Sequence, residues 1–219
     1  MRSLLVLLFL ISSTFSNGQG VIVLQDKPFV YSNHRDTSVW NQLSANTTFN
    51  TLSTPEKEFF YWNNLMRKNP SLFGETVLKE FLLQFPEANS AEAKSLLSDL
   101  KQTKPQLSFL VPEEGLIKMA RLHAADIKKR GGIISHQSSS GKGFVERIKE
   151  AGAYRCGAEN VFVGTPDPLS ALILLLIDKG VRDKGHRKNL LDPTFNLMGA
   201  SFVETGKNKA VLVQDFGCK

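Results

Sequence analysis

Two histidines and one glutamate have the clearest potential for chemistry in this chain. They are His136, next to Ser135, Glu159 in the stretch 158–161, and His186 in the stretch 185–189. Imidazole nitrogens and carboxylate oxygens are typical ligands of Zn²⁺, and the same groups serve as general acids and bases. The intervals between the three residues are too long for one helix or one hairpin. Only a tertiary fold could gather them, and such a fold would form a polar cleft.

Two interpretations of this set stay open. In the first, His136, His186 and Glu159 hold zinc or another divalent metal, with one coordination position left for water. In the second, the same three side chains form a hydrogen-bonded network that joins three loops. The chain has no His-Glu-x-x-His helix and no Cys-x-x-Cys pair, so no local motif favours coordination.

A third histidine, His123, falls inside a helix predicted over residues 112–129. It shares one face of that helix with Leu116, Ala120 and Ile127. Asp126 follows three residues later, close enough to interact across one turn. The pattern predicts a structural pair, a core-facing His123 held by Asp126, rather than a ligand-binding one.

The elements that would position these residues are mostly helices. Capping signals and prolines predict helices beginning near residues 54, 70 and 90. Residues 169–177 follow Asp167-Pro168 and are apolar on every face, so we predict a central helix covered on all sides. It ends at Asp178, and a Gly-containing turn then leads to His186. Two β-prone runs, 197–203 and 210–216, predict a β-hairpin, and helices flanking a few strands favour an α+β or α/β layout.

The N-terminus has the build of a secretory signal peptide. A positive start is followed by an apolar run over residues 4–11 and a small, polar stretch to residue 20. The run is too short to span a bilayer, and no later stretch reaches about 20 uncharged apolar residues. We therefore expect residues 1–20 to be a signal peptide, 21–52 a partly ordered arm and 53–219 the domain. The protein would be secreted, extracellular or periplasmic, and not membrane-spanning.

Composition narrows the class of partner. The 219 residues are 42% hydrophobic and 22% charged, which is ordinary for a globular protein. The net charge of +6 comes from dispersed lysines without interleaved aromatic residues, so nucleic acid is not an expected partner. Cys156 and Cys218 allow one intramolecular disulfide, which export would permit, or two buried free thiols.

The chain resembles a known family through five motifs taken together. Residues 122–126 (LHAAD), 135–136 (SH), 158–161 (AENV), 185–189 (GHRKN) and 213–217 (VQDFG) occur in the order and spacing of the CAP superfamily. This superfamily contains the cysteine-rich secretory, antigen-5 and pathogenesis-related proteins, and its domain is also called the SCP domain. The resemblance covers about residues 53–216 and looks closest to the bacterial SCP-like branch.

The resemblance implies an α-β-α sandwich of the α+β class, with a small central antiparallel sheet and a cleft. In the family the cleft carries two histidines and two acidic residues, which in some members hold zinc or another divalent metal. His136 and His186 match the histidines and Glu159 matches one acid. The second acid would be Asp178 or Asp183, the nearest carboxylates to its usual place. Family members are also reported to bind sterols or other lipids, and a few have been proposed as proteases.

Three functions follow from these observations, in order of preference. The first is a non-enzymatic module whose cleft binds a small or lipid-like ligand, or a metal. The second is an extracellular scaffold that binds cell-wall components or other macromolecules. The third is a metal-dependent hydrolase in which Glu159 acts as general base on a bound water. No Gly-x-Ser-x-Gly sequence marks an activated serine nucleophile, which is why an enzyme is not the first choice.

Overall fold

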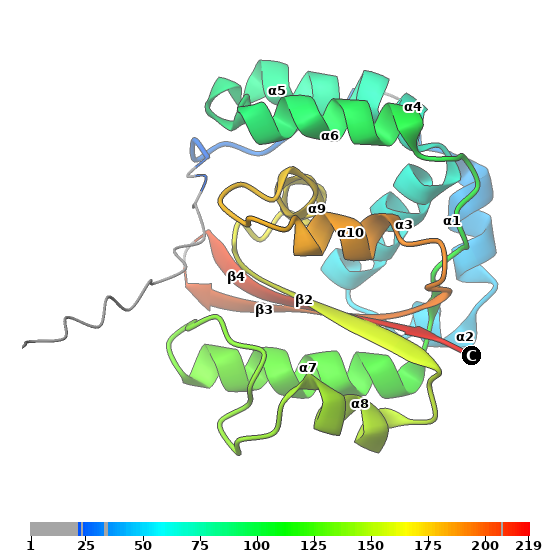
Figure 1. Ribbon diagram of the computed structural model, residues 1–219, viewed down its shortest axis with the longest axis vertical. Helices are drawn as coiled ribbons and strands as arrows, with labels where there is room; N and C mark the ends of the chain where they lie inside the picture. Colours follow the sequence, from blue (N-terminus) through cyan, green and yellow to red (C-terminus); the bar gives the residue numbers. More distant parts are fainter. Residues whose placement is uncertain (1–21, 23, 33–34, 207) are drawn as a thin grey trace, which may run out of the picture.

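A helical layer covers each face of a small sheet in the computed structural model, which describes residues 22, 24–32, 35–206 and 208–219 (Figure 1). On one face lie α7 (Glu114–Lys129) and α8 (Phe144–Ala151). On the other lie α3 (Thr54–Lys68), α9 (Pro168–Ile177) and α10 (Gly185–Leu191). The arrangement is an α+β fold, as the sequence predicts. The predicted signal peptide lies outside the described residues.

The sheet contains four strands in the order β1-β3-β4-β2. Their bounds are β1 Val111–Pro112, β2 Cys156–Gly164, β3 Leu197–Gly206 and β4 Lys209–Cys218. The pairs β2–β4 and β3–β4 are antiparallel, and β3 with β4 forms the predicted hairpin. The two-residue strand β1 is parallel to β3, so the expected antiparallel sheet is extended by one short parallel strand.

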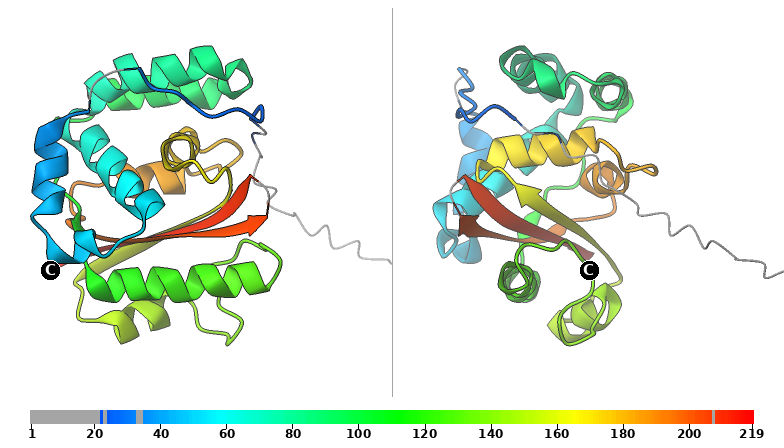
Figure 2. Two further views of the ribbon diagram at one scale, coloured as in Figure 1. Left: turned by 180° about the vertical axis from the view of Figure 1, so that it is seen from behind. Right: turned by 90° about the vertical axis from the view of Figure 1, so that its left-hand side faces the viewer.

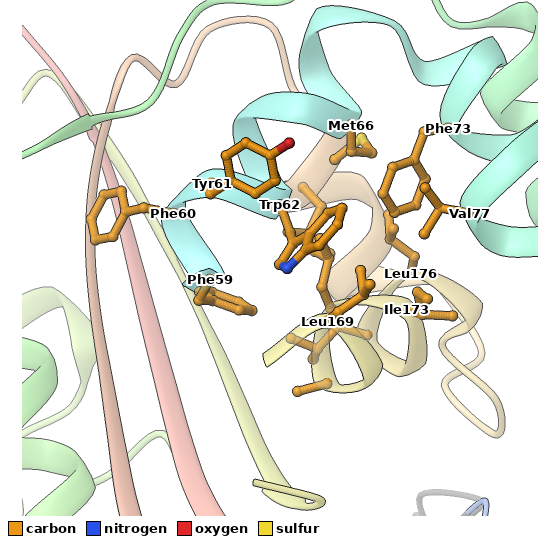
Figure 3. Close-up of a cluster of buried hydrophobic side chains, with 14 of the residues drawn as sticks. Phe59, Phe60, Tyr61, Trp62, Met66, Phe73, Val77, Leu169, Ile173 and Leu176 are labelled. Carbon is orange, nitrogen blue, oxygen red and sulfur yellow. The ribbon is translucent and has the colours of Figure 1, made fainter. Parts of the chain in front are cut away.

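The helix α9 is central because it has no polar face. Asp167 caps it by accepting a hydrogen bond from the backbone N–H of Ser170. Aromatic side chains of α3 cover one of its sides, and Figure 3 shows Trp62 next to Leu169 of α9. The edge-to-face contact between Phe59 and Phe202, with ring centroids 5.3 Å apart, joins α3 to the sheet. The predicted burial of this helix on all sides is confirmed.

Further helices form an outer layer beyond α9 (Figure 2). They are α4 (Pro70–Phe73), a π-helical turn (Gly74–Leu78), α5 (Lys79–Gln84), a 3-10 turn (Pro86–Ala88) and α6 (Ala91–Gln102). The first residue of α6 follows Ser90, whose side chain accepts from the N–H of Ala93. In the sequence, Asn89 and Glu92 have the spacing of a capping box, which predicts Asn89 as the cap; this is one residue too early.

The N-terminal arm is more ordered than its lack of periodicity suggests. It carries two short helices, α1 (Thr37–Ser44) and α2 (Thr47–Asn50). Asp36 and Asn46 cap them, each by accepting a hydrogen bond from a backbone N–H of the first turn. Both helices are too short to produce a readable hydrophobic period, which is why the sequence gives no signal for them.

The helix α7 packs unusually close to β3 because of Gly199. A Cβ atom at position 199 would lie 2.2 Å from the carbonyl carbon of Leu116, so only glycine lets the helix backbone reach the strand at this point. Ala120 and Ala124 of α7 then pack on Val213 of β4 in a small second core. Close packing holds α7, and with it His123, against the sheet.

A disulfide joins Cys156 to Cys218, which are partners in the register of β2 and β4. Of the two alternatives left open by the sequence, the bridge is the one present. It ties the first residue of β2 to the last residue of β4. None of the described helices combines the length and the apolar composition needed to cross a membrane.

Packing around α9 should contribute most to stability. We expect Leu172→Ala, at a fully buried position of α9, to lower the free energy of unfolding by about 2–5 kcal/mol, because it removes transfer energy and leaves a cavity. The matched change Leu83→Ala, at a position 82% exposed, should cost less than about 0.5 kcal/mol. Urea unfolding of both variants checks this. Equal losses would contradict the central role of α9.

Candidate functional site

The alternation of side chains along β2 separates the predicted site residues. Glu159 points to the α7 and α8 side of the sheet, where it contacts residues of both helices. Asn160 points to the opposite side. There its side chain donates a hydrogen bond to Gln214 and accepts one from Asn189 of α10. His186 belongs to α10, and α10 covers the opposite face of the sheet from α7 and α8 (Figure 1). The structure thus forms two polar groups instead of the single cleft expected from sequence.

The first group, which we call the Glu159 cluster, consists of His123, His136, Arg147, Glu159 and Asp215. His136 Nδ1 lies 2.8 Å from Glu159 Oε1. Arg147 Nη2 lies 2.8 Å from the same oxygen and 2.7 Å from Oε2. Burial raises the pKa of the Glu159 carboxyl, but the hydrogen bond to His136 and the charge of Arg147 outweigh it, and the net shift is downward. Glu159 is therefore a buried, ionised carboxylate.

Asp215 completes this cluster from the neighbouring strand. It is the cross-strand partner of Glu159 and is fully buried. Neither of its oxygens has a donor among the described side chains and backbone groups. Burial, followed by the charge of Glu159, raises the pKa of Asp215 well above its ordinary value. With a proton kept on Asp215, the two buried carboxyls of Asp215 and Glu159 carry one negative charge between them.

His123 is buried as predicted, but its partner is different. Its Nε2 lies 2.8 Å from the carbonyl oxygen of Ser135, and the carboxylate of Asp126 instead accepts from the N–H of Ser139 and pairs with Arg130. Asp126 acts on His123 only as a more distant charge. Burial lowers the pKa of His123, so the ring is neutral at neutral pH. Its contact with Ser135 fixes the loop that carries His136.

The second group is the pair His186–Asp178, at the start of α10. His186 Nδ1 lies 2.7 Å from Asp178 Oδ1, and Asp178 Oδ2 accepts from the backbone N–H groups of His186 and Arg187. Asp178 ends α9 in the left-handed conformation with φ 55°, which aspartate tolerates, and this turns its carboxylate toward α10. The carboxylate fixes the orientation of the ring, and Nε2 has no partner among the residues that the structure describes.

Arg187 holds this pair in place. Its buried guanidinium donates to the carbonyls of Leu176 and Ile177 at the end of α9. It also pairs with Asp99 of α6 at 2.8 Å. One side chain therefore ties α6, α9 and α10 together next to His186. Asp183, the other acid that the family resemblance suggests, is exposed in the loop before α10 and takes no part in either group.

A cavity of about 800 Å³ opens beside the second group. His186, Asp178 and Lys179 line one end of it. Its walls are mainly apolar and come from β2 and α9, including Phe162, Val163, Leu174 and Leu175, and from the N-terminal segment at residues 22 and 24–28. Asn208 and Lys209 of the β3–β4 turn lie at the margin. Its lining follows α9 from Asp167 to Asp178, and His186 lies beside Asp178. His136 and Glu159 do not line it.

A metal ion fits the Glu159 cluster poorly as it is arranged. The guanidinium of Arg147 contacts both carboxylate oxygens of Glu159, so the charge that would attract a cation is already neutralised. Among the residues that the structure describes, no three His, Cys, Asp or Glu side chains are placed to hold an ion. The zinc hypothesis for His136, His186 and Glu159 stays a prediction.

The family follows from comparison with known proteins. The model of the cysteine-rich secretory protein (CAP) family matches residues 103–216, just over half of the chain. The chain therefore belongs to the CAP family. This agrees with the resemblance carried by the five sequence motifs, each of which supplies one residue to the two polar groups.

The similarity to individual relatives covers part of the chain. The uncharacterized protein YkwD of Bacillus subtilis (strain 168) is 30% identical over 124 residues, which are 55% of this chain and 46% of YkwD. An extracellular protein containing a SCP domain from Bacillus anthracis str. Ames has a TM-score of 0.45 and 22% identity, over 57% of this chain and 40% of that one. An outer surface protein of Borrelia burgdorferi has a TM-score of 0.44 and 19% identity, over 58% of this chain and 92% of that one. The chain thus spans less than half of YkwD.

Two members of the Glu159 cluster were not predicted from sequence. In the sequence, the apolar residues Phe144, Val145 and Ile148 predict the inward face of a short helix, but in the helix of residues 144–151 Val145 is 56% exposed and Arg147 is buried. Helical spacing alone gives no reason to bury an arginine. For Asp215 a signal existed, because an acidic residue interrupts a run of β-prone apolar residues in the second strand of the predicted hairpin.

The raised pKa of Asp215 predicts a pH dependence of stability. A group whose pKa is raised by folding stabilises the folded state below its unfolded pKa, and this contribution is lost as pH rises through the folded pKa. We therefore expect Asp215→Asn, which replaces the protonated carboxyl by a neutral amide, to become progressively more stable than the wild type as pH increases. Thermal melts of both proteins between acidic and alkaline pH check this. A stability difference that stays constant with pH would contradict a raised pKa at Asp215.

The neutralised Glu159 predicts weak metal binding. We expect the melting temperature of metal-free protein to stay unchanged on adding zinc, because a ligand stabilises only in proportion to its binding to the folded state. The same titration on His136→Ala is the control. A zinc-dependent rise in the wild type that His136→Ala abolishes would contradict the expectation and restore the metal hypothesis.

Proposed function

We propose that this chain is an exported CAP-domain protein that binds an elongated, largely apolar ligand in the cavity beside α9, without transforming it. The observation that carries the proposal is the His186–Asp178 pair at one end of a mainly apolar cavity. A volume of about 800 Å³ falls in the range of roughly 300–1,000 Å³ that small-molecule sites occupy. Apolar walls with few polar groups are what such sites have in common.

The chemistry of the polar end supports binding more than turnover. Asp178 is hydrogen-bonded to Nδ1 of His186, so Nε2 can form one hydrogen bond with a hydroxyl, carbonyl or carboxyl group of the ligand. No serine or cysteine hydrogen-bonds to either His186 or His136 through its side chain among the described residues. The apolar body of the ligand would then lie against Phe162 and Leu174. This pairing of one polar group with a long apolar body fits a lipid-like molecule.

The hydrolase alternative has less support. It needs Glu159 as a general base, and Glu159 is held by His136 and Arg147 and lies outside the cavity. A pKa below the ordinary value further weakens Glu159 as a base. The scaffold alternative predicts binding to cell-wall fragments that does not depend on the cavity. Export is supported by the character of residues 1–20 and by the Cys156–Cys218 bridge, which suits an oxidising compartment.

Filling the cavity should abolish tight binding. We expect the wild type to bind dansylated undecanoic acid with an increase in fluorescence, and Leu174→Trp to bind it about ten- to a hundredfold more weakly. This corresponds to the loss of two or three buried methylene contacts of the probe. Fluorescence titration measures both affinities.

The matched control is Leu122→Trp, at a position on α7 that is 66% exposed and does not line the cavity. It should bind as the wild type does. If the wild type fails to bind the probe and all members of a panel of lipids and cell-wall fragments, or if both tryptophan variants bind equally well, the cavity is not the ligand site.

A further inference from the structure

The outer wall of the cavity is a single stretch of chain, residues 24–28, which we call the strap. Leu24, Gln25, Asp26, Lys27 and Pro28 all line the cavity. Residues 25–28 are nevertheless exposed to solvent, so the wall is only one residue thick here. In Figure 1 the strap is the blue segment that descends from the outer helical layer toward the end of the β3–β4 hairpin. The opposite wall, formed by β2 and α9, is part of the folded core.

One end of the strap is anchored by Phe29, and the rest is held by the packing of partly buried Leu24 against the core and by exposed polar contacts. Phe29, which follows the strap, is buried edge-to-face against Phe81 at 5.1 Å and Phe85 at 6.2 Å between ring centroids. At the far side, Asn208 Nδ2 donates to Asp26 Oδ1 at 2.6 Å across an exposed contact. We call this contact the latch. Phe29 provides a fixed point about which the strap can turn.

The forces on the two ends differ in kind. Phe29 is held by burial of aromatic surface, which is costly to undo. Besides the latch, the backbone N–H of Gln25 donates to Glu87, again in an exposed contact, and Lys27 lies over the ring of Phe85 at 5.0 Å. Water can replace exposed hydrogen bonds at small net cost, so removing one shifts an equilibrium by only about 2- to 10-fold. The latch is therefore the side that opens.

The position of the strap in the chain also matters. It lies outside residues 103–216, the part that the CAP family model matches, whereas β2, α9 and His186 lie inside that part. One wall of the cavity thus belongs to the shared domain and the other to a segment beyond the match. Because the strap lies beyond the match, it is suited to adapt the cavity of the shared domain to a particular ligand.

We propose that the strap is the gate of the ligand cavity and supplies a specificity-determining contact through Leu24. The latch opens, the strap turns about Phe29, the ligand enters lengthwise along α9, and Leu24 then covers its apolar body. This inference rests on the proposed function, because the strap would control the entry of the ligand into the cavity beside α9.

The test is a stopped-flow measurement of dansylated undecanoic acid binding to the full chain. Asp26→Ala and Asn208→Gly each remove the latch, and glycine retains the positive φ of 59° found at position 208. Each variant should raise both the association and the dissociation rate constants by about 2- to 10-fold, since both steps pass through the open state. The double variant should add nothing further, because both changes remove the same bond.

The matched control removes an exposed contact of the same segment on the other side of Phe29. Ser32→Ala eliminates the hydrogen bond from Ser32 to Glu80 on α5, at a position that does not line the cavity. It should leave both rate constants unchanged. Leu24→Ala should raise only the dissociation rate, because it removes contact with the bound probe without loosening the latch.

The outcomes separate the two proposals. Latch variants with wild-type rate constants, together with a Leu174→Trp variant that still binds weakly, overturn the gate and leave the cavity as the binding site. Rate constants that rise equally in Ser32→Ala also overturn it, because the effect would then come from general loosening of the arm. If Leu174→Trp binds the probe as tightly as the wild type, the proposed function itself is wrong.

Discussion

Burial of α9 is the constraint on which the rest of the structure depends. A ten-residue helix without a polar face can exist in water only if other elements cover every side of it. The sheet, α3 and the outer helices provide that cover (Figure 3). Its ends are the two places where polar groups are required, and the unpaired carbonyls at its C-terminus are satisfied by Arg187. Arg187 adjoins His186, so the need to end α9 also places the histidine beside the cavity.

The two-residue period of a strand explains why one motif serves two separate groups. In the Ala-Glu-Asn stretch of β2, adjacent side chains face opposite sides of the sheet. Glu159 is therefore the centre of a buried ionic cluster, while Asn160 bonds to Asn189 of α10 and to Gln214. Motifs that follow one another in sequence need not converge in space. Here they stabilise the two faces of the sheet independently.

Local signals made much of the fold predictable. The start of α3, the burial of α9 and the β3–β4 hairpin follow from capping residues and hydrophobic period, which act over a few positions. The π-helical turn at residues 74–78 and the two-residue β1 have no such signal and depend on tertiary packing. Within the site, contact between His136 and Glu159 was predicted, but the position of His186 across the sheet was not, because spacing along a chain does not determine which face a later helix covers.

The burial of Arg147 likewise could not be predicted from local sequence signals. Arg147 occupies a helix whose apolar residues suggested a different inward face, and it is buried only because Glu159 provides a charge for it on the neighbouring strand. Such a pairing depends on two elements at once and cannot be read from either alone. Asp215 differs, since its position in an apolar strand already implies that it must share a proton or find a partner.

The Cys156–Cys218 bridge has a topological consequence. It closes a covalent ring of the chain that contains β2, α9, α10, β3 and β4, and so encloses the inner wall of the cavity together with His186. The strap lies outside this ring. A cross-link of this kind limits how far the enclosed segments can separate even when the domain is disturbed. The fixed wall of the cavity is thus part of a closed loop, while the strap lies outside that loop and is held against the domain by non-covalent contacts.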